Sequence, residues 1–311
     1  MVLLMGMLYA STYYQLDPTN VQVMLGIVFA AVLFISFGSF SLIPTFMASR
    51  DVFYKQRGAN FFRTSSYVLA NSLSLAPISL METIAFGSLI YWMCGFTSSV
   101  GPFLIFELLM LLENMSFGAW FFFISSASQD MNVAAPVAML SILFSILFTG
   151  FVVLKSQIPD YFIWIYWLSP MSWTIRAIAI NQYRASEFDV CVYDDIDYCG
   201  QFGGKTMGEY YLELFDIASE KEWIIYAIIY LVALYFLFMS FSYFALEYRR
   251  HESPENVSVP KPEEQKDNYV LATTPKVSSD SYTISDQVVN VHTGETHFVP
   301  VSLAFQDLWY T

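Results

Sequence analysis

The stretch "SRDVFYKQRGANFFRTSS", residues 49–66, separates two long apolar runs and carries four basic residues, Arg50, Lys55, Arg57 and Arg63. An apolar run of about 20 residues is long enough to cross a lipid bilayer as a helix. Short connections rich in lysine and arginine remain on the cytosolic side of a membrane. The stretch therefore predicts two membrane helices joined by a cytosolic connection.

The composition of the whole chain agrees with a membrane protein. Its 311 residues are 56% hydrophobic and only 13% charged, and the mean hydropathy is +0.49. A soluble domain has about a quarter of its residues charged. The formal net charge of −13 comes from carboxylates concentrated in residues 187–222 and in the C-terminal tail. No basic patch is large enough for nucleic-acid binding, so nucleic acid is excluded as a partner.

Six apolar segments are candidate membrane helices, so the predicted fold is an all-α membrane protein with a six-helix transmembrane bundle. They cover approximately residues 1–14, 21–43, 67–96, 102–124, 133–154 and 223–246. The first segment is too short to span a bilayer and has no basic start typical of a signal peptide. It is expected to be a truncated helix that began earlier in a longer chain, with an interfacial helix as the alternative.

The side of each connection follows from its basic residues. The connections 15–20 and 95–102 contain no lysine or arginine, so six alternating spans place residues 155–222 outside and the C-terminus inside. Residues 158–183 are aromatic and interrupted by two prolines, which suits a re-entrant or interfacial helical hairpin.

Two cysteines, Cys191 and Cys199, fall in the predicted extracellular loop 155–222. An oxidising compartment favours disulfides, so a bridge between these two residues is expected. Two free thiols are the alternative.

The chain changes character after the sixth apolar segment. Residues 249–296 are polar and predict a disordered cytosolic linker. If they are cytosolic, the glycosylation sequon at Asn256 is not used. Residues 297–311 alternate apolar and polar side chains, which indicates one strand of a soluble domain that is missing from this chain.

The sequence offers no catalytic or metal-binding set. "CGQFGGKT", residues 199–206, ends like a phosphate-binding loop, but Cys199 stands where the first glycine of that motif belongs. All three histidines, His251, His292 and His297, follow the last apolar segment. The chain is therefore not expected to be an enzyme, to hold a metal or to contain ATPase motifs.

Five segments, in this order and spacing, resemble the membrane domain of G-type ABC transporters. They are "RDVFYKQRGANFFRTSSYVLA" (50–70), "FTGFVV" (148–153), "WIYWLSPMSWTIRAIAINQY" (164–183), "TMGEYYL" (206–212) and "FVPVSLAFQDLWYT" (298–311). The resemblance implies an ABC-2 type transmembrane domain at residues 1–248 and the start of a second nucleotide-binding domain at 297–311. It is the arrangement of the first transmembrane domain of a full-size, pleiotropic drug resistance type transporter, of which this chain is then a fragment.

The resemblance also implies a function and partners. The expected function is ATP-driven export of hydrophobic or amphipathic compounds, such as drugs, xenobiotics or lipids, across the plasma membrane. ATP and magnesium bind the missing nucleotide-binding domains, and the chain itself has no cofactor. Its partners are the lipid bilayer, those nucleotide-binding domains, a second membrane domain and hydrophobic small molecules. A non-transporting membrane scaffold or a degenerate transporter fragment is the alternative.

Residue roles follow from matching positions in that family. The expected substrate pathway is Phe34, Phe37, Met139, Leu143, Phe151 and Val152, with Phe151 and Val152 forming an apolar plug at the outer end. Packing against lipid or in the core is the alternative for each of these residues. The expected coupling elbow, which contacts the ATPase domain, is Arg50, Lys55, Arg57 and Arg63. Family members often carry a glutamate before the elbow's first arginine, but here that residue is Ser49, so a salt bridge there is either absent or made by Asp51.

Two acidic residues, Glu82 and Glu113, lie inside predicted spans. A charge at the centre of a bilayer costs about 2.5–3.5 kcal/mol on insertion scales, so these carboxyl groups are expected to be protonated, paired or facing the bundle. Hydrogen bonds between packed helices, with Asn71 and Asn114 as possible neighbours, are favoured over a proton relay.

Overall fold

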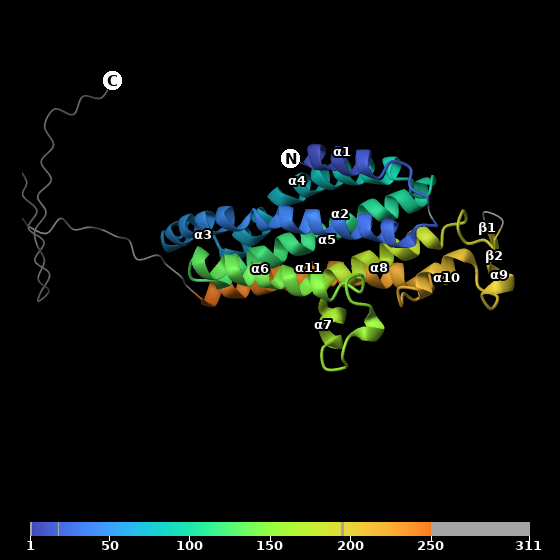
Figure 1. Cartoon of the computed structure of the whole chain (residues 1–311). Helices are drawn as coiled ribbons and strands as arrows, with labels where there is room; N and C mark the ends of the chain where they lie inside the picture. Colours follow the sequence, from blue (N-terminus) through green and yellow to red (C-terminus); the bar gives the residue numbers. More distant parts are fainter. Residues whose placement is uncertain (1, 18, 194–195, 250–311) are drawn as a thin grey trace, which may run out of the picture. The chain divides into compact units, whose positions relative to one another are not determined.

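The computed structural model describes residues 2–17, 19–193 and 196–249, and these are mostly helical (Figure 1). The predicted linker, after Arg249, and the predicted strand at 297–311 lie outside the described residues. The apolar helices are α1 (Val2–Thr12), α2 (Val21–Phe40), α4 (Thr64–Met93), α5 (Val100–Ala127), α6 (Met131–Leu147) and α11 (Glu222–Tyr248).

Four stretches of the described chain are long and apolar enough to cross a membrane. They are Val21–Gly58, Thr64–Met93, Val100–Ala127 and Glu222–Tyr248. Helices α1 and α6 are apolar but shorter. The structure is therefore compatible with a membrane bundle, while the count of six spans stays a prediction.

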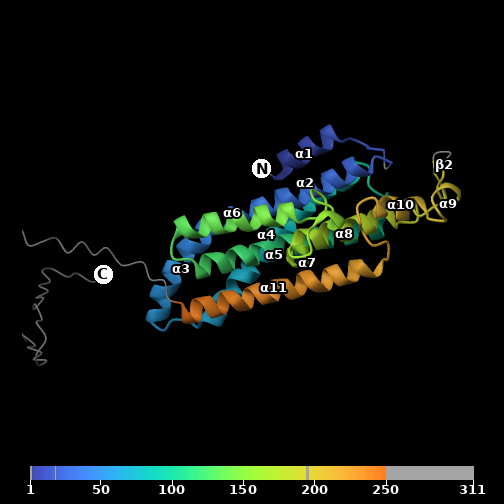
Figure 2. The same ribbon diagram turned by 60° about the horizontal axis from the view of Figure 1, so that its bottom comes forward.

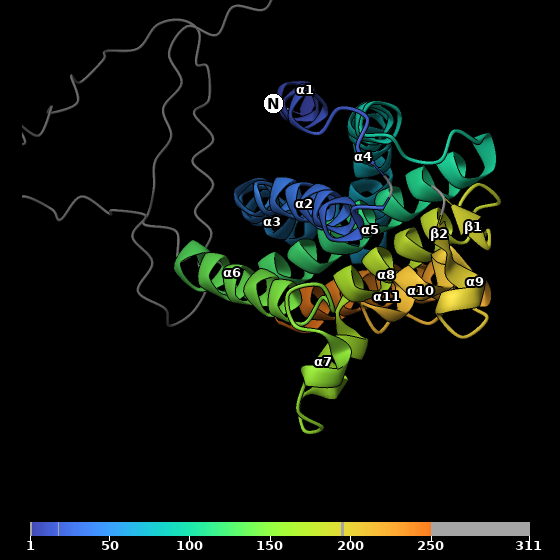
Figure 3. The ribbon, with the colours of Figure 1, turned by 45° about the vertical axis from the view of Figure 1, so that its right-hand side comes forward.

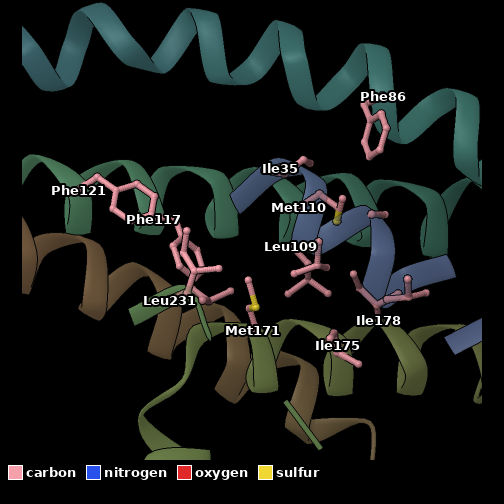
Figure 4. Close-up of a cluster of buried hydrophobic side chains, with 14 of the residues drawn as sticks. Ile35, Phe86, Leu109, Met110, Phe117, Phe121, Met171, Ile175, Ile178 and Leu231 are labelled. Carbon is pink, nitrogen blue, oxygen red and sulfur yellow. The ribbon is translucent and has the colours of Figure 1, made fainter. Parts of the chain in front are cut away.

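Helix α5 lies at the centre of the helix packing. It contacts α2, α4, α8 (Pro170–Tyr183) and α11, while α1 packs beside α4. Figure 2 shows α11 running along α5, and Figures 1 and 3 show α1 next to α4. Side chains from α2, α4, α5, α8 and α11 meet in one buried cluster (Figure 4), which includes Ile35, Phe86, Leu109, Phe117, Ile175 and Leu231.

The basic connection after α2 is itself mostly a helix, α3 (Ile43–Gly58). Its buried residues Phe46, Arg50, Phe53 and Tyr54 recur at three- and four-residue spacing and so lie on one helical face. That face packs on α5 and α6, and the exposed side carries Lys55 and Gln56 together with the apolar Val52. A buried face at helical spacing therefore explains a helix where the sequence analysis placed a connection.

Helix α6 ends earlier than predicted, at Leu147 rather than near residue 154. Gly150 follows with a φ of +85°, a conformation that favours glycine. A Cβ at this glycine would lie 2.9 Å from a ring carbon of Tyr166. The chain therefore turns here towards the 3₁₀ turn η1 (Lys155–Gln157) and α7 (Ile163–Leu168), which projects from the bundle in Figures 1 and 3.

After α8, the predicted extracellular loop contains a short two-stranded sheet and two small helices. Strands β1 (Val192–Tyr193) and β2 (Ile196–Asp197) pair antiparallel, and α9 (Tyr198–Gln201) and α10 (Met207–Glu213) follow. The Gly-Lys-Thr sequence lies immediately before α10. Its last residue, Thr206, caps the helix in a capping box with Glu209. This local role explains the sequence without a phosphate.

Two further contacts hold α10 in place. The Arg184 guanidinium donates to Asp189 at 2.9 Å and to Glu209 at 2.7 Å. The hydroxyls of Tyr198 and Tyr211 lie 2.9 Å apart, and burial raises the pKa of the Tyr211 phenol. This phenol therefore stays neutral at physiological pH and remains able to donate a hydrogen bond.

The structure joins Cys191 and Cys199 in a disulfide, across a separation of eight residues. We expect the double substitution Cys191→Ser, Cys199→Ser to destabilise this region by about 2 kcal/mol, the lower part of the usual range because the closed loop is short. Thermal unfolding of the purified protein, with and without reductant, measures this loss. Alkylation of both thiols in the unreduced wild-type protein would contradict the bridge.

Candidate functional site

Arg50 connects α3 to the end of α5. Its side chain is 3% exposed, and its guanidinium donates to the carbonyl oxygens of Ser125 at 2.6 Å, Ser128, and Gln129 at 3.0 Å. The last carbonyls of a helix have no partner within the helix, and a cation there also interacts favourably with the helix dipole. Arg50 therefore caps α5 from a neighbouring element.

Ser49 stands where family members often carry a glutamate, so the partners of Ser49 and Arg50 show whether a salt bridge is formed here. The Ser49 hydroxyl lies 2.8 Å from the Tyr67 hydroxyl, so Ser49 connects α3 to α4. An Asp51 oxygen lies 4.0 Å from Arg50 Nε. At that distance Asp51 forms a weak ion pair, and the backbone carbonyls are the main partners of Arg50.

Arg57 connects the other end of α3 to α11. Its guanidinium donates to Glu247 at 2.6 Å and to the Leu246 carbonyl at 3.1 Å. The second oxygen of Glu247 accepts from the Thr64 hydroxyl at 2.6 Å, at the first residue of α4. The two other predicted elbow residues, Lys55 and Arg63, are exposed. Arg50 and Arg57 thus hold α3 against the bundle, whereas Lys55 and Arg63 lie at the surface.

The predicted plug residue Phe151 packs between two other rings. Its ring stacks on Phe29 of α2 at 5.2 Å and on Phe215 at 6.2 Å. Phe37 is half-buried on α2, turned roughly 80° from Phe29 and roughly 60° from Phe34 about the helix axis. The Phe34 ring lies 4.8 Å from Phe86 of α4. Phe151 thus packs on α2 through Phe29, Phe34 packs α2 on α4, and Phe37 lies between these two directions.

The remaining predicted pathway residues are exposed on the described chain. Met139 and Leu143 lie on α6 with 42% and 50% of their surface exposed, and Val152 is 50% exposed. Their four-residue spacing puts Met139 and Leu143 on one face of α6. This apolar face is open to lipid or to another part of a complete assembly.

Arg176 of α8 lies in a cage of aromatic rings. Its guanidinium carbon is 4.7 Å from the ring centres of Trp167 and Trp173, 5.1 Å from Tyr166 and 5.3 Å from Trp223. Cation–π contacts contribute about 0.5–2 kcal/mol each, and they allow a charge to be buried without a carboxylate. Within the described residues no carboxylate forms an ion pair with Arg176, which is only 5% exposed.

The family model for ABC-2 type transporters matches residues 1–183. The chain belongs to the ABC-2 type transporter family. The matched residues contain α1 to α8, and therefore α3, the predicted pathway residues, and Arg176 with every ring of its cage except Trp223. Membership and the long apolar helices together make this a multi-pass membrane protein.

Curated relatives to which the chain is similar are ABC transporters of the G family. ABC transporter G family member 2 of Dictyostelium discoideum is 31% identical over 184 residues, covering 58% of this chain and 14% of that protein. G family member 5 of the same organism is 28% identical, covering 81% and 18%. G family member 35 of Oryza sativa subsp. japonica is 25% identical, covering 99% and 22%. The chain spans about a fifth or less of the length of these relatives.

The two acidic residues predicted inside spans have different surroundings in this ABC-2 domain. Glu113 is fully buried and accepts a hydrogen bond from Thr174 of α8 at 2.7 Å, so it connects α5 to α8. Glu82 is exposed on α4. Asn114 accepts from Ser39 of α2 at 2.8 Å rather than pairing with Glu113. Glu113 and Asn114 therefore both join helices within the bundle.

Sequence reasoning missed three residues of this region. Phe29 could have been found as an aromatic residue of the second predicted span, and Arg176 as the only basic residue in the aromatic segment 158–183. Glu107 accepts a hydrogen bond from Ser88 of α4 at 3.2 Å and was visible as a carboxylate in a predicted span. Three rings around Arg176 are close to it in sequence, but Trp223 and the partners of Phe29 and Glu107 belong to other segments, so those contacts could not be predicted.

Proposed function

We propose that this chain is the membrane-spanning part of an ATP-driven exporter of hydrophobic or amphipathic compounds. The observation that carries the proposal is the anchoring of α3. Arg50 bonds it to the end of α5, and Arg57 bonds it through Glu247 to the end of α11 and the start of α4. A force applied to α3 therefore reaches three other helices through buried or partly buried contacts.

In this proposal α3 is the element that an ATPase domain moves. Lys55 and Arg63 are exposed and offer positive charge to that domain, while Arg50 and Arg57 carry the movement into the bundle. ATP and magnesium bind in nucleotide-binding domains outside this chain. Such a movement requires that α3 bind one conformation of the nucleotide-binding domains more strongly than the other. In this proposal the charged residues on α3 supply that difference in binding.

The proposed pathway follows the half-buried face of α2 towards Phe151. A site for apolar compounds needs aromatic and aliphatic walls with a few polar groups, and Phe37, Met139 and Leu143 are side chains of that kind. Phe151 and Val152 close its outer end in this proposal. Phe34 takes part through the packing that holds α2 on α4.

The wider arrangement is also part of the proposal. Residues 155–222 form an extracellular cap, residues 249–296 are a cytosolic linker, and residues 297–311 begin a second nucleotide-binding domain. These features fit a full-size transporter of the pleiotropic drug resistance type in the plasma membrane. A non-transporting scaffold is the competing function, and only a transport measurement separates the two.

The test is ATP-dependent efflux of hydrophobic dyes by the full-length protein, with and without an intact phosphate loop in its motor domain. We expect Phe37→Ala to change the relative transport of two dyes by up to roughly tenfold, because one wall of an apolar site discriminates by that order. The ATPase rate is expected to change little.

The matched control is Phe236→Ala, which removes a ring that is 63% exposed on α11. It should leave the dye preference unchanged. Dye efflux that is independent of the phosphate loop would contradict the proposed function. An unchanged preference in Phe37→Ala would remove that residue from the pathway.

A further inference from the structure

A cavity beside Phe151 contains one buried positive charge. It lies between α2, the turn after α6, α7, α8 and the turn after α10. Apolar side chains line about half of it, and Thr149, Tyr166 and Arg176 supply its polar groups. The lining is therefore amphipathic, and among the described residues the guanidinium is its only charged group.

The hydrogen-bonding capacity of Arg176 is not used up within the described residues. Its guanidinium hydrogen-bonds to the Ser172 hydroxyl at 3.3 Å from Nη2 and to the Tyr166 side chain, whereas its Nε is buried and has no hydrogen-bond partner among the described residues. The nearest buried carboxylate on a packed element, Glu113, accepts from Thr174 instead. The aromatic rings stabilise the positive charge through contact with the flat faces of the guanidinium. The N–H groups at the edge of the guanidinium still need acceptors, and a ring face is not a strong hydrogen-bond acceptor.

We propose that Arg176 binds the anionic head group of an amphipathic compound in this cavity. A sulfate, carboxylate or phosphate oxygen supplies both the missing counter-charge and the missing acceptor, and such charge-assisted bonds are the strong ones. The apolar body then lies along Leu25, Phe151 and Ile217.

The position of Phe151 explains how such a compound enters. The cavity has room for about one water molecule in this structure. Phe151 forms part of its wall and stacks on Phe29, so displacement of this one ring enlarges the space next to Arg176. The interpretation of this compound as transported cargo rests on the proposed export function. Its binding at Arg176 does not depend on export.

The experiment uses the full-length protein in nanodiscs and two probes with the same apolar body. Pyrenebutyrate carries an anionic head, and pyrenebutanol carries a neutral one. The wild-type protein is expected to bind pyrenebutyrate more tightly. Arg176→Gln should weaken pyrenebutyrate binding about tenfold or more, the value of a charge-assisted hydrogen bond, and leave pyrenebutanol within about twofold. Arg176→Lys should retain part of the preference.

A second variant covers the case in which Arg176→Gln does not fold. Ile217→Phe fills the half-exposed rim of the cavity without altering the arginine, and it should weaken pyrenebutyrate binding as well. Equal affinity of the wild-type protein for both probes would overturn the proposal. Inorganic sulfate, which has no apolar body, should compete weakly for the pyrenebutyrate site. If inorganic sulfate displaced pyrenebutyrate as strongly as a carboxylate with an apolar body does, the role of the apolar body would be overturned.

A transport measurement separates this inference from the proposed function. Efflux of pyrenebutanol by Arg176→Gln at the wild-type rate, with loss of pyrenebutyrate efflux, supports both. Efflux of both probes by Arg176→Gln at unchanged rates overturns the role of the bound compound as cargo, and the binding comparison decides the site. If the wild-type protein exports neither probe nor any hydrophobic dye, the export function fails, and the binding comparison still decides the site.

Discussion

Gly208→Ala is expected to abolish the folding of the region that contains the disulfide. A Cβ at residue 208 would lie 1.9 Å from the carbonyl oxygen of Tyr183, and the Gly208 amide donates to the Phe188 carbonyl at 3.1 Å. The obstacle is backbone at the end of α8, so no side-chain rotation relieves it. Inserting an extra atom into a packed site usually lowers the free energy of unfolding by about 1–3 kcal/mol, and we expect the loss at residue 208 to reach or exceed the upper end of that range.

The measurement is the yield and thermal stability of folded full-length protein on size-exclusion chromatography. Gly101→Ala is the matched control, since a Cβ there meets no atom within 4 Å and the residue lies in the first turn of α5. The control should behave as wild type. A Gly208→Ala protein with wild-type yield and melting temperature would show that α10 does not approach α8 as described.

Arg50→Ala is expected to cause the second large loss of folded protein. It removes the donor from three carbonyl oxygens at the end of α5, of which those of Ser125 and Ser128 belong to buried residues while Gln129 is exposed. Each buried group left without a partner costs about 1–3 kcal/mol, so two of them amount to a large part of the stability of a typical domain. Arg50→Lys should recover only part, because lysine has no planar fork of donors.

Arg63→Ala is the control for charge, since it removes the same positive charge from an exposed residue. It should fold normally, and if the coupling proposal holds it should lower transport more than folded yield. Folded yields of the three variants, measured side by side, decide the matter. Equal yields for Arg50→Ala and Arg63→Ala would contradict the capping role of Arg50.

The long apolar helices could be predicted from sequence because their signal is local. Helices α2, α4, α5 and α11 overlap the predicted segments, since about 20 apolar residues are sufficient evidence for each. The end of α6 could not be predicted in the same way. Apolar residues continue past Leu147, and the turn depends on the conformation of Gly150 and on a ring from α7.

The candidate site was less predictable because its contacts join distant residues. The basic stretch marked Arg50 and Arg57, but their acceptors on α5 and α11 have no local signature. The same holds for Arg176, whose cage takes Trp223 from a helix nearly fifty residues away. The composition of the chain indicates a membrane protein. Which side chains contact one another depends on how the helices pack, and the composition does not show this.

The two anchors of α3 also set an order for biosynthesis. Arg50 finds its first acceptor 75 residues later in the chain, and Arg57 finds Glu247 190 residues later. At about 5–20 residues per second, a ribosome takes roughly 10 to 40 s to synthesise that second interval. During this time α3 cannot form its contact with α11, so Arg57 lacks its Glu247 partner until α11 has been synthesised.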